Sequence, residues 1–144
     1  MRVLRGVVSA RHGAATGNLA PYEELILTRT GLSAMVPGTL NITLPERYLV
    51  REDAIISSNE YFTGEILKLQ RCRAFGRRMI IMRPDSHEFS HSNGANVLEL
   101  VSNIHLRRTF LLKDGDNVEV EVEGDENWWA AADPEVNTFS PPKA

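Results

Sequence analysis

The sequence predicts a mainly β fold, a small six-stranded β-barrel with one or two short helices, and three observations support this prediction. A chain of 144 residues with 42% hydrophobic side chains can fill one compact core but not two full domains. Several short segments alternate apolar and polar residues as strands do. Turn residues separate these segments, and few stretches show helical features. We therefore expect one domain over residues 1–124 and a partly disordered tail over 125–144.

The chain begins with a predicted strand, a loop and a helix. Residues 2–9 are rich in valine and indicate the first strand. Residues 10–18 are small or polar and indicate a loop. A helix is expected from Pro21 onwards, because proline and acidic residues suit a first helical turn, and Gly31 is a plausible end for it.

The clearest alternation lies in residues 39–44. Leu40, Ile42 and Leu44 fall on one face of the predicted strand. The opposite face then carries a row of oxygen-bearing side chains: Thr39, Asn41 and Thr43. Residues 46–62 show a weaker pattern and predict a loop or short irregular structure.

The middle of the chain predicts a hairpin followed by a long loop. Residues 66–73 and 78–82 indicate two strands, joined by a turn at 74–77. Residues 84–96 are polar and predict a surface loop, and a loop of that length is often a lid or a binding loop.

The last part of the domain predicts a strand, a short helix and a final strand. Residues 97–101 are apolar apart from Glu99 at their centre. Residues 103–111 indicate a short helix capped by Ser102. After a turn at 113–116, valines alternate with glutamates over 118–123, which indicates a strand with one buried and one solvated face.

Charge is unevenly distributed over a net value of −3. Residues 1–83 carry 12 basic and 7 acidic residues, whereas residues 84–144 carry 4 and 12. The two halves should therefore attract each other. The arginine-rich segment 71–78 could hold the phosphates of a nucleotide or of nucleic acid, although solvated basic surface is more common.

The composition also bounds the location and chemistry of the chain. Cys72 is the only cysteine, so an internal disulfide is impossible, and we expect a buried, inert thiol. No stretch approaches the length needed to cross a bilayer. We expect a cytoplasmic protein with no membrane contact.

The segment from Pro37 to Asn41 is the best candidate for chemistry. Gly38 would let the backbone approach a ligand closely. Thr39 and Asn41 offer neutral oxygens, which suit Mg²⁺ when phosphates supply the negative charge. Spacing alone, however, favours a turn leading into a strand with a solvated polar face.

Residues 37–44, PGTLNITL, resemble the signature of the CTP-dependent riboflavin kinases. A second block, LELVSNIHLR at 98–107, and the LKDGD sequence at 112–116 are similar to that family in order and spacing. The opening Gly6–Ser9 and a tyrosine-containing helix leading to Gly31-Leu32 also fit. The resemblance runs over roughly residues 4–123.

This resemblance implies a cradle-loop (RIFT-related) β-barrel that moves the terminal phosphate of CTP to riboflavin, giving FMN and CDP. It implies Thr39 and Asn41 as the Mg²⁺ ligands. It implies Ser86 and Glu99 as flavin-binding residues, with Glu99 the catalytic candidate. The implied nucleotide contacts are Ala10, Arg11, His12, Gly13, Ala14, Ala15, Ile104, His105, Leu106 and Arg107.

The loop after the first strand departs from the glycine-rich pattern of the family. Here it reads Ala10-Arg11-His12-Gly13-Ala14, and the lost glycines would change how backbone amides meet phosphates. The alternative is therefore a non-catalytic nucleotide- or flavin-binding barrel derived from that family. Nucleic-acid binding conflicts with the acidic second half. We expect no nucleic-acid partner and a monomer or weak homo-oligomer.

Overall fold

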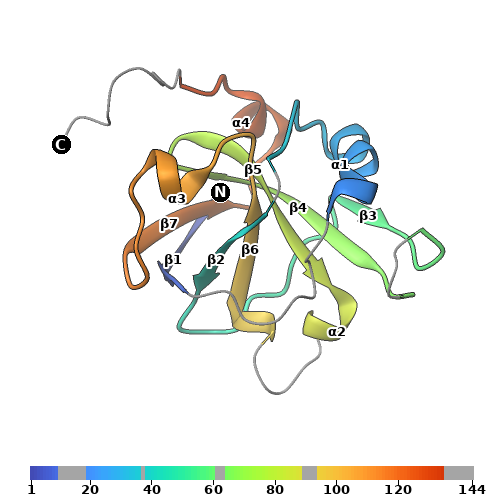
Figure 1. Cartoon of the computed structure of the whole chain (residues 1–144), viewed down its shortest axis with the longest axis horizontal. Coiled ribbons are helices and arrows are strands. Elements are labelled where there is room, and N and C mark those ends of the chain that lie inside the picture. Colours follow the sequence, from blue (N-terminus) through green and yellow to red (C-terminus); the bar gives the residue numbers. More distant parts are fainter. Residues whose placement is uncertain (10–18, 37, 61–63, 89–93, 135–144) are drawn as a thin grey trace.

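The chain forms a closed six-stranded antiparallel barrel (Figure 1) in the computed structural model, which describes residues 1–9, 19–36, 38–60, 64–88 and 94–134. The strand order is β4-β5-β6-β2-β1-β7, and a pairing of β7 with β4 closes the barrel. The barrel strands are β1 (Arg2–Val8), β2 (Leu40–Thr43), β4 (Leu67–Ala74), β5 (Arg77–Pro84), β6 (Val97–Val101) and β7 (Asn117–Val122).

The expected barrel and its six strands are thus confirmed. A further strand, β3 (Ala54–Ile56), pairs with β4 outside the closed ring. It lies within residues 46–62, where the sequence predicted loop or irregular structure. Three residues are too few to show a period of two, so the pattern could not reveal this strand.

Apolar side chains from every barrel strand fill its interior. On β7, Val118, Val120 and Val122 are 4% exposed or less, and the intervening glutamates face outward, as predicted. Leu40 and Ile42 of β2 join the same core. Each such side chain stabilises the fold by roughly 1.5–3 kcal/mol when fully buried. The alternation therefore fixes which face of each strand can carry polar chemistry.

A second core lies between the outer face of the barrel and α1 (Glu23–Thr30). Helix α1 contacts β3 and β4 and buries Ile26 completely. A 3₁₀ turn, Ala20–Tyr22, precedes the helix. Gly31 ends it with φ 85°, and its amide donates to Leu27 O at 2.9 Å. The predicted helix and its end at Gly31 are confirmed.

The segment after the last strand folds back onto the barrel through α4 (Glu126–Ala130). Trp129 is 6% exposed, and its indole N–H donates to Cys72 O at 3.0 Å. Asp125 caps the helix by accepting from the Trp128 amide at 2.8 Å. Residues 125–134 of the segment predicted as a tail therefore pack on the barrel, and residues 135–144 lie outside the described residues.

Three short helical segments follow the barrel hairpin: α2 (Asp85–Glu88), a 3₁₀ turn (Gly94–Asn96) and α3 (Leu106–Thr109). The predicted helix over 103–111 thus begins three residues late. Its predicted cap is wrong, because His105 precedes the first turn and no side chain caps it. Ser102 instead exchanges hydrogen bonds with the backbone of Ile104, which tightens the bend before α3.

The arginines of residues 71–78 hold the C-terminal segment in place. Arg73 and Arg77 are buried, 6% and 4% exposed. Arg73 donates to the carbonyls of Trp129 and Ala131 at 3.0 and 2.9 Å. These two guanidinium groups are engaged in the fold, so they neither form solvated basic surface, the more common case, nor face a phosphate.

Ion pairs join the basic first half of the chain to the acidic second half, as predicted. They include Arg2–Glu123, Arg5–Glu119, Arg71–Glu126 and Arg78–Asp133. Because many of these groups are exposed, each pair stabilises the fold only slightly.

Cys72 lies inside the barrel with no exposed surface. Burial raises the pKa of its thiol far above the ordinary range. The expected burial of this thiol is confirmed. Among the described residues, no helix is both long enough and apolar enough to cross a membrane.

Gly6 sets the distance between β1 and β2, which predicts a clear cost for any side chain there. A Cβ at Gly6 would lie 2.6 Å from Thr43 O and 2.7 Å from Ile42 Cγ2. We expect Gly6→Ala to lower the free energy of unfolding by about 1–3 kcal/mol in a denaturant titration. Val7→Ala, at an exposed neighbour, should lower it by less than about 1 kcal/mol. A Gly6→Ala protein as stable as wild type would contradict this packing.

The two tryptophans of α4 predict different costs of truncation. Trp129→Ala should lower the free energy of unfolding by about 3–5 kcal/mol, because it empties part of the second core. Trp128 is only half-buried, and its indole N–H donates to Glu121 at 2.9 Å, so Trp128→Ala is the matched control with a smaller loss. Chemical denaturation followed by circular dichroism measures both. Equal losses would show that α4 does not dock through Trp129.

Candidate functional site

Two polar side chains face each other across β2 and β6 on the outside of the barrel. Asn41 is the register partner of Glu99. Their neighbours Leu40 and Leu100 belong to the barrel core, so Asn41 and Glu99 point outward on the same face. Both are nevertheless buried, 5% and 8% exposed. Because burying polar side chains is costly, a buried pair of this kind marks a candidate site.

Thr39 extends this polar face by one position. Its hydroxyl donates to Asn41 Oδ1 at 3.5 Å, so the two oxygens lie side by side. Neighbouring ligands of an octahedral Mg²⁺ ion, each about 2.0–2.1 Å from the metal, lie roughly 3 Å apart. A small closure would bring both oxygens onto one ion. The donor set therefore fits Mg²⁺ provided that phosphates add negative charge.

Carboxylate and imidazole clusters offer no rival metal site in the described part of the chain. No group of three or more His, Cys, Asp or Glu side chains there is arranged to hold a metal ion. A site built from neutral oxygens, such as that of Thr39 and Asn41, is of a different chemical type.

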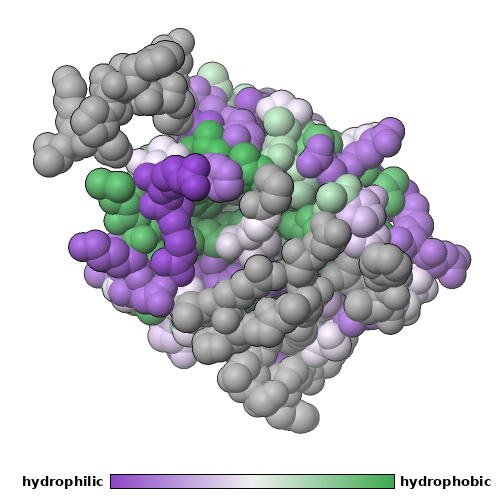
Figure 2. All heavy atoms as spheres, viewed as in Figure 1, coloured by the Kyte–Doolittle hydropathy of each residue, from purple (hydrophilic) through white to green (hydrophobic). Residues whose placement is uncertain are grey.

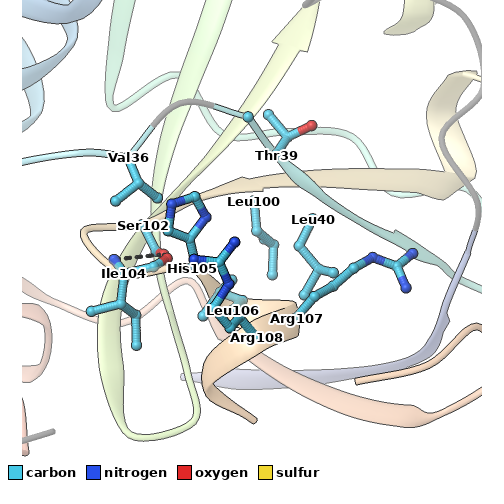
Figure 3. A pocket seen from close by; sticks show the side chains of 11 residues that line it. Val36, Thr39, Leu40, Leu100, Ser102, Ile104, His105, Leu106, Arg107 and Arg108 are labelled. Atoms are coloured by element: carbon cyan, nitrogen blue, oxygen red, sulfur yellow. Dashed lines mark hydrogen bonds between the residues drawn. The ribbon is translucent and has the colours of Figure 1, made fainter. Parts of the chain in front are cut away.

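A pocket of about 260 Å³ opens beside Thr39 (Figure 3). One wall is the segment that leads into β2, and the other runs from the end of β6 into α3. The lining residues are Val36, Gly38, Thr39, Leu40, Leu100, Ser102, Ile104, His105, Leu106, Arg107 and Arg108.

The pocket lining is cationic. It contains two arginines and a histidine but no aspartate or glutamate among the described residues. Figure 2 shows strongly hydrophilic side chains gathered over α3, with hydrophobic ones next to them. Positive charge beside a hydroxyl and an apolar floor suits a phosphorylated organic ligand.

Ser9 directly follows β1 and is held at the edge of this site. Its amide donates to Asn41 O at 3.0 Å, and its carbonyl accepts from Arg107 Nη2 at 3.1 Å. The predicted nucleotide-binding residues 10–15 follow directly in the sequence and lie outside the described residues. Ser9 itself is therefore held between β2 and α3.

The LKDGD turn supports the same end of β1. The Gly115 amide donates to Val8 O at 2.7 Å, and the Val8 amide donates to Asp116 O at 2.8 Å. Asp114 pairs with Arg107 at 2.7 Å. The two sequence blocks singled out for their spacing thus meet around one strand end.

Comparison with known families assigns the chain. Residues 10–122 match the family model of the CTP-dependent riboflavin kinases (CTP-dep RFKase), described as "Domain of unknown function DUF120". This match covers more than half of the chain. The chain belongs to the CTP-dependent riboflavin kinase family.

Three similar proteins are archaeal and carry the name riboflavin kinase. The protein from Methanocella arvoryzae is 34% identical over 93 residues, which is 60% of this chain and 41% of the relative. That from Archaeoglobus fulgidus is 36% identical over 96 residues, 60% and 39% of the two chains. That from Pyrobaculum arsenaticum is 34% identical over 132 residues, 85% and 60%. The chain thus spans about 40 to 60% of the length of these relatives.

The described site residues that the family resemblance implies lie in three places. Ile104, His105, Leu106 and Arg107 line the pocket together with Thr39. Asn41 and Glu99 face each other beside it. Ser86 lies apart, at the start of α2, where its amide and hydroxyl both donate to Glu65 at 2.7 and 3.2 Å.

The direction of β6 relates these groups to one another. Thr39 and the pocket lie at the end where β6 leads into α3, whereas α2 lies at its opposite end (Figure 1). Glu99 is the middle residue of the strand. The predicted site residues are therefore distributed along β6, with Glu99 between its two ends.

Sequence reasoning missed part of the pocket. Val36, Gly38, Ser102 and Arg108 line it but were not among the predicted site residues. Arg108 follows Arg107 directly, so the doubled arginine in the second block was the available signal. The contribution of Val36 and Ser102 depends on a backbone bond between the Val36 amide and Ser102 O, 2.9 Å long, which no local pattern reveals.

Proposed function

We propose that this chain is a riboflavin kinase that transfers the terminal phosphate of CTP to riboflavin, giving FMN and CDP. Family membership supports riboflavin as the acceptor, and the family name supports CTP as the donor. The observation that carries the proposal is the cationic pocket directly beside the Thr39–Asn41 oxygen pair, with Glu99 on the neighbouring strand.

The nucleotide binds in the pocket beside α3. Phosphoryl transfer depends on alignment and on neutralising charge more than on covalent chemistry by the protein. The arginines that line the pocket supply positive charge, and the 10–15 segment contributes the remaining nucleotide contacts that the family resemblance implies. Recognition of cytosine rather than another base rests on that resemblance.

Thr39 and Asn41 hold Mg²⁺ through their side-chain oxygens. When bound, the ion neutralises the phosphate charge that would otherwise repel the acceptor hydroxyl. The rigid antiparallel strand keeps Asn41 in place, and the Thr39 hydroxyl stays within 3.5 Å of it. Both side chains are therefore oriented before any ligand arrives.

Glu99 orients riboflavin. Its carboxylate accepts a hydrogen bond from the 5′-hydroxyl of the ribityl chain and can also accept the proton of that hydroxyl. The cross-strand position opposite Asn41 brings the acceptor next to the metal-binding residues. Ser86, beyond the far end of β6, contacts the flavin there. The cytoplasmic location and the monomeric or weakly oligomeric state stay predictions.

The direct test is an assay for FMN formation with Mg²⁺, with CTP and ATP compared as donors and FMN separated from riboflavin by chromatography. We expect FMN to form preferentially with CTP. If the folded protein binds riboflavin or a nucleotide but makes no FMN from either donor, the chain is a non-catalytic binding barrel. The altered loop at residues 10–15 would then be the first place to search for the cause.

Removing the Asn41 amide should stop turnover without unfolding the protein. We expect Asn41→Ala to lower kcat by about 100-fold or more, because a misplaced metal and phosphate lose the required alignment. Thr43→Ala, on the same face of β2 but opposite Val97 and not Glu99, is the matched control and should keep near wild-type kcat. Circular dichroism checks the fold of both variants. Undiminished activity of Asn41→Ala would remove Asn41 from the metal site.

Neutralising Glu99 should affect the acceptor and not the donor. Glu99→Gln keeps the shape of the side chain but replaces one acceptor oxygen with an amide. We expect the KM for riboflavin to rise about tenfold and kcat to fall, because a hydrogen bond to a charged group is lost. The KM for CTP should stay unchanged. A rise in the KM for CTP alone would place Glu99 on the nucleotide side of the site.

A further inference from the structure

Arg107 and Arg108 are neighbours on α3 and both line the pocket, but the structure uses them differently. Arg107 Nη2 donates to Ser9 O at 3.1 Å and to Asp114 Oδ1 at 2.7 Å. Arg108 has neither a hydrogen bond nor an ion pair within the described part of the chain, and it is exposed. The Arg107 guanidinium thus bonds to the protein itself, whereas the Arg108 guanidinium can bond to a ligand.

The directions of the two side chains agree with this difference. In Figure 3, the Arg107 side chain extends away from His105, whereas the Arg108 guanidinium lies beside the imidazole of His105. Thr39 lies on the opposite wall, and its hydroxyl is directed away from Arg108 in this view. An anion bound between the walls could therefore contact the Arg108 guanidinium.

Electrostatics also separate the two arginines. A phosphate approaching the Arg107 guanidinium would meet the Asp114 carboxylate 2.7 Å from it, so repulsion would offset much of the attraction. Arg108 has no such carboxylate, and a phosphate bound to it displaces no ion pair among the described residues. A free arginine fork is also the side chain best suited to phosphate oxygens.

We propose that Arg108 binds the phosphates of the nucleotide, whereas Arg107 is a positioning residue that acts through Ser9 and Asp114. This assignment rests on the proposed function, because it names which residue of the same site meets the donor phosphates. It changes the role that the family resemblance gives to Arg107, and it adds a binding residue that sequence reasoning missed.

Arg107 works as a clamp. By bonding Ser9 O it fixes where the chain leaves β1, and by pairing with Asp114 it ties that point to the turn before β7. The same turn donates the Gly115 amide to Val8 O. Loss of these bonds would free Ser9 O, and the residues that the family resemblance assigns to the nucleotide follow Ser9 directly in the sequence, so contacts to every part of the nucleotide would weaken.

The test compares the full chain with Arg108→Gln, Arg107→Gln and Asp114→Asn in equilibrium titrations with CTP, CDP and cytidine at several salt concentrations. For Arg108→Gln we expect CTP to bind about tenfold more weakly or worse, with cytidine binding unchanged and a smaller dependence of CTP affinity on salt. For Arg107→Gln we expect CTP and cytidine to weaken by the same factor, with the salt dependence kept.

Asp114→Asn distinguishes positioning from direct contact. Because Arg107 and Asp114 act through one ion pair, the double variant Arg107→Gln/Asp114→Asn should weaken CTP binding no more than Arg107→Gln alone. Additive losses would show that Arg107 binds the nucleotide directly. Unchanged CTP affinity in Arg108→Gln would overturn the assignment of Arg108.

The wild-type protein separates failure of this inference from failure of the proposed function. If it makes FMN from CTP while Arg108→Gln binds CTP normally, only the role of Arg108 is wrong. If wild type binds none of CTP, CDP and cytidine, both the proposed function and the assignment of Arg108 fail. Thermal unfolding of each variant confirms that the folded protein is being titrated.

Discussion

The register between β2 and β6 is the constraint on which the rest of the site depends. It places Asn41 opposite Glu99 on the outer face and sends Leu40 and Leu100 into the barrel. A slip of one residue would reverse both faces, burying the polar pair among apolar side chains and exposing the leucines. The closed barrel strongly disfavours that slip. The same register therefore both packs the core and places Asn41 opposite Glu99.

The ends of the strands turn this polar pair into a pocket. The bend at Ser102 directs α3 back over the end of β2, and the bond from the Val36 amide to Ser102 O joins the two walls. Ser9 is fixed between them. Each of these contacts is a backbone hydrogen bond or a short side-chain bond to backbone. The pocket is therefore built by the fold, and the side chains that line it add charge.

The sequence predicted those parts of the fold in which one residue type repeats with a clear period. The valines of β7 and the apolar residues Leu40 and Ile42 of β2 showed their faces directly, because alternation reports burial. The short β3 and the late start of α3 escaped, since three or four residues are too few to establish a period. The arginines of residues 71–78 read as a basic surface, whereas Arg73 and Arg77 are buried against backbone carbonyls that only the fold brings near.

In the candidate site, too, the sequence predicted residues with a local pattern and missed contacts that only the fold creates. Spacing put Thr39 and Asn41 on one face of a strand, and family resemblance added Glu99 and residues 104–107. Neither could separate Arg107 from Arg108, because the difference lies in Ser9 and Asp114, which are distant in sequence from one another. Ser86 was chosen for its hydroxyl, and its bonds to Glu65 depend on how α2 meets the segment before β4.

The central claim is that donor and acceptor bind along the outer face of β6, and nuclear magnetic resonance of the labelled chain tests it most directly. The protein would be titrated with CDP and Mg²⁺, and then with FMN. We predict that CDP shifts the amides of residues 38–41 and 102–108, and that FMN shifts those around Glu99 and α2. Shifts gathered instead around Arg51, Arg71 and Trp128, where a separate cavity of about 440 Å³ lies, would contradict the claim.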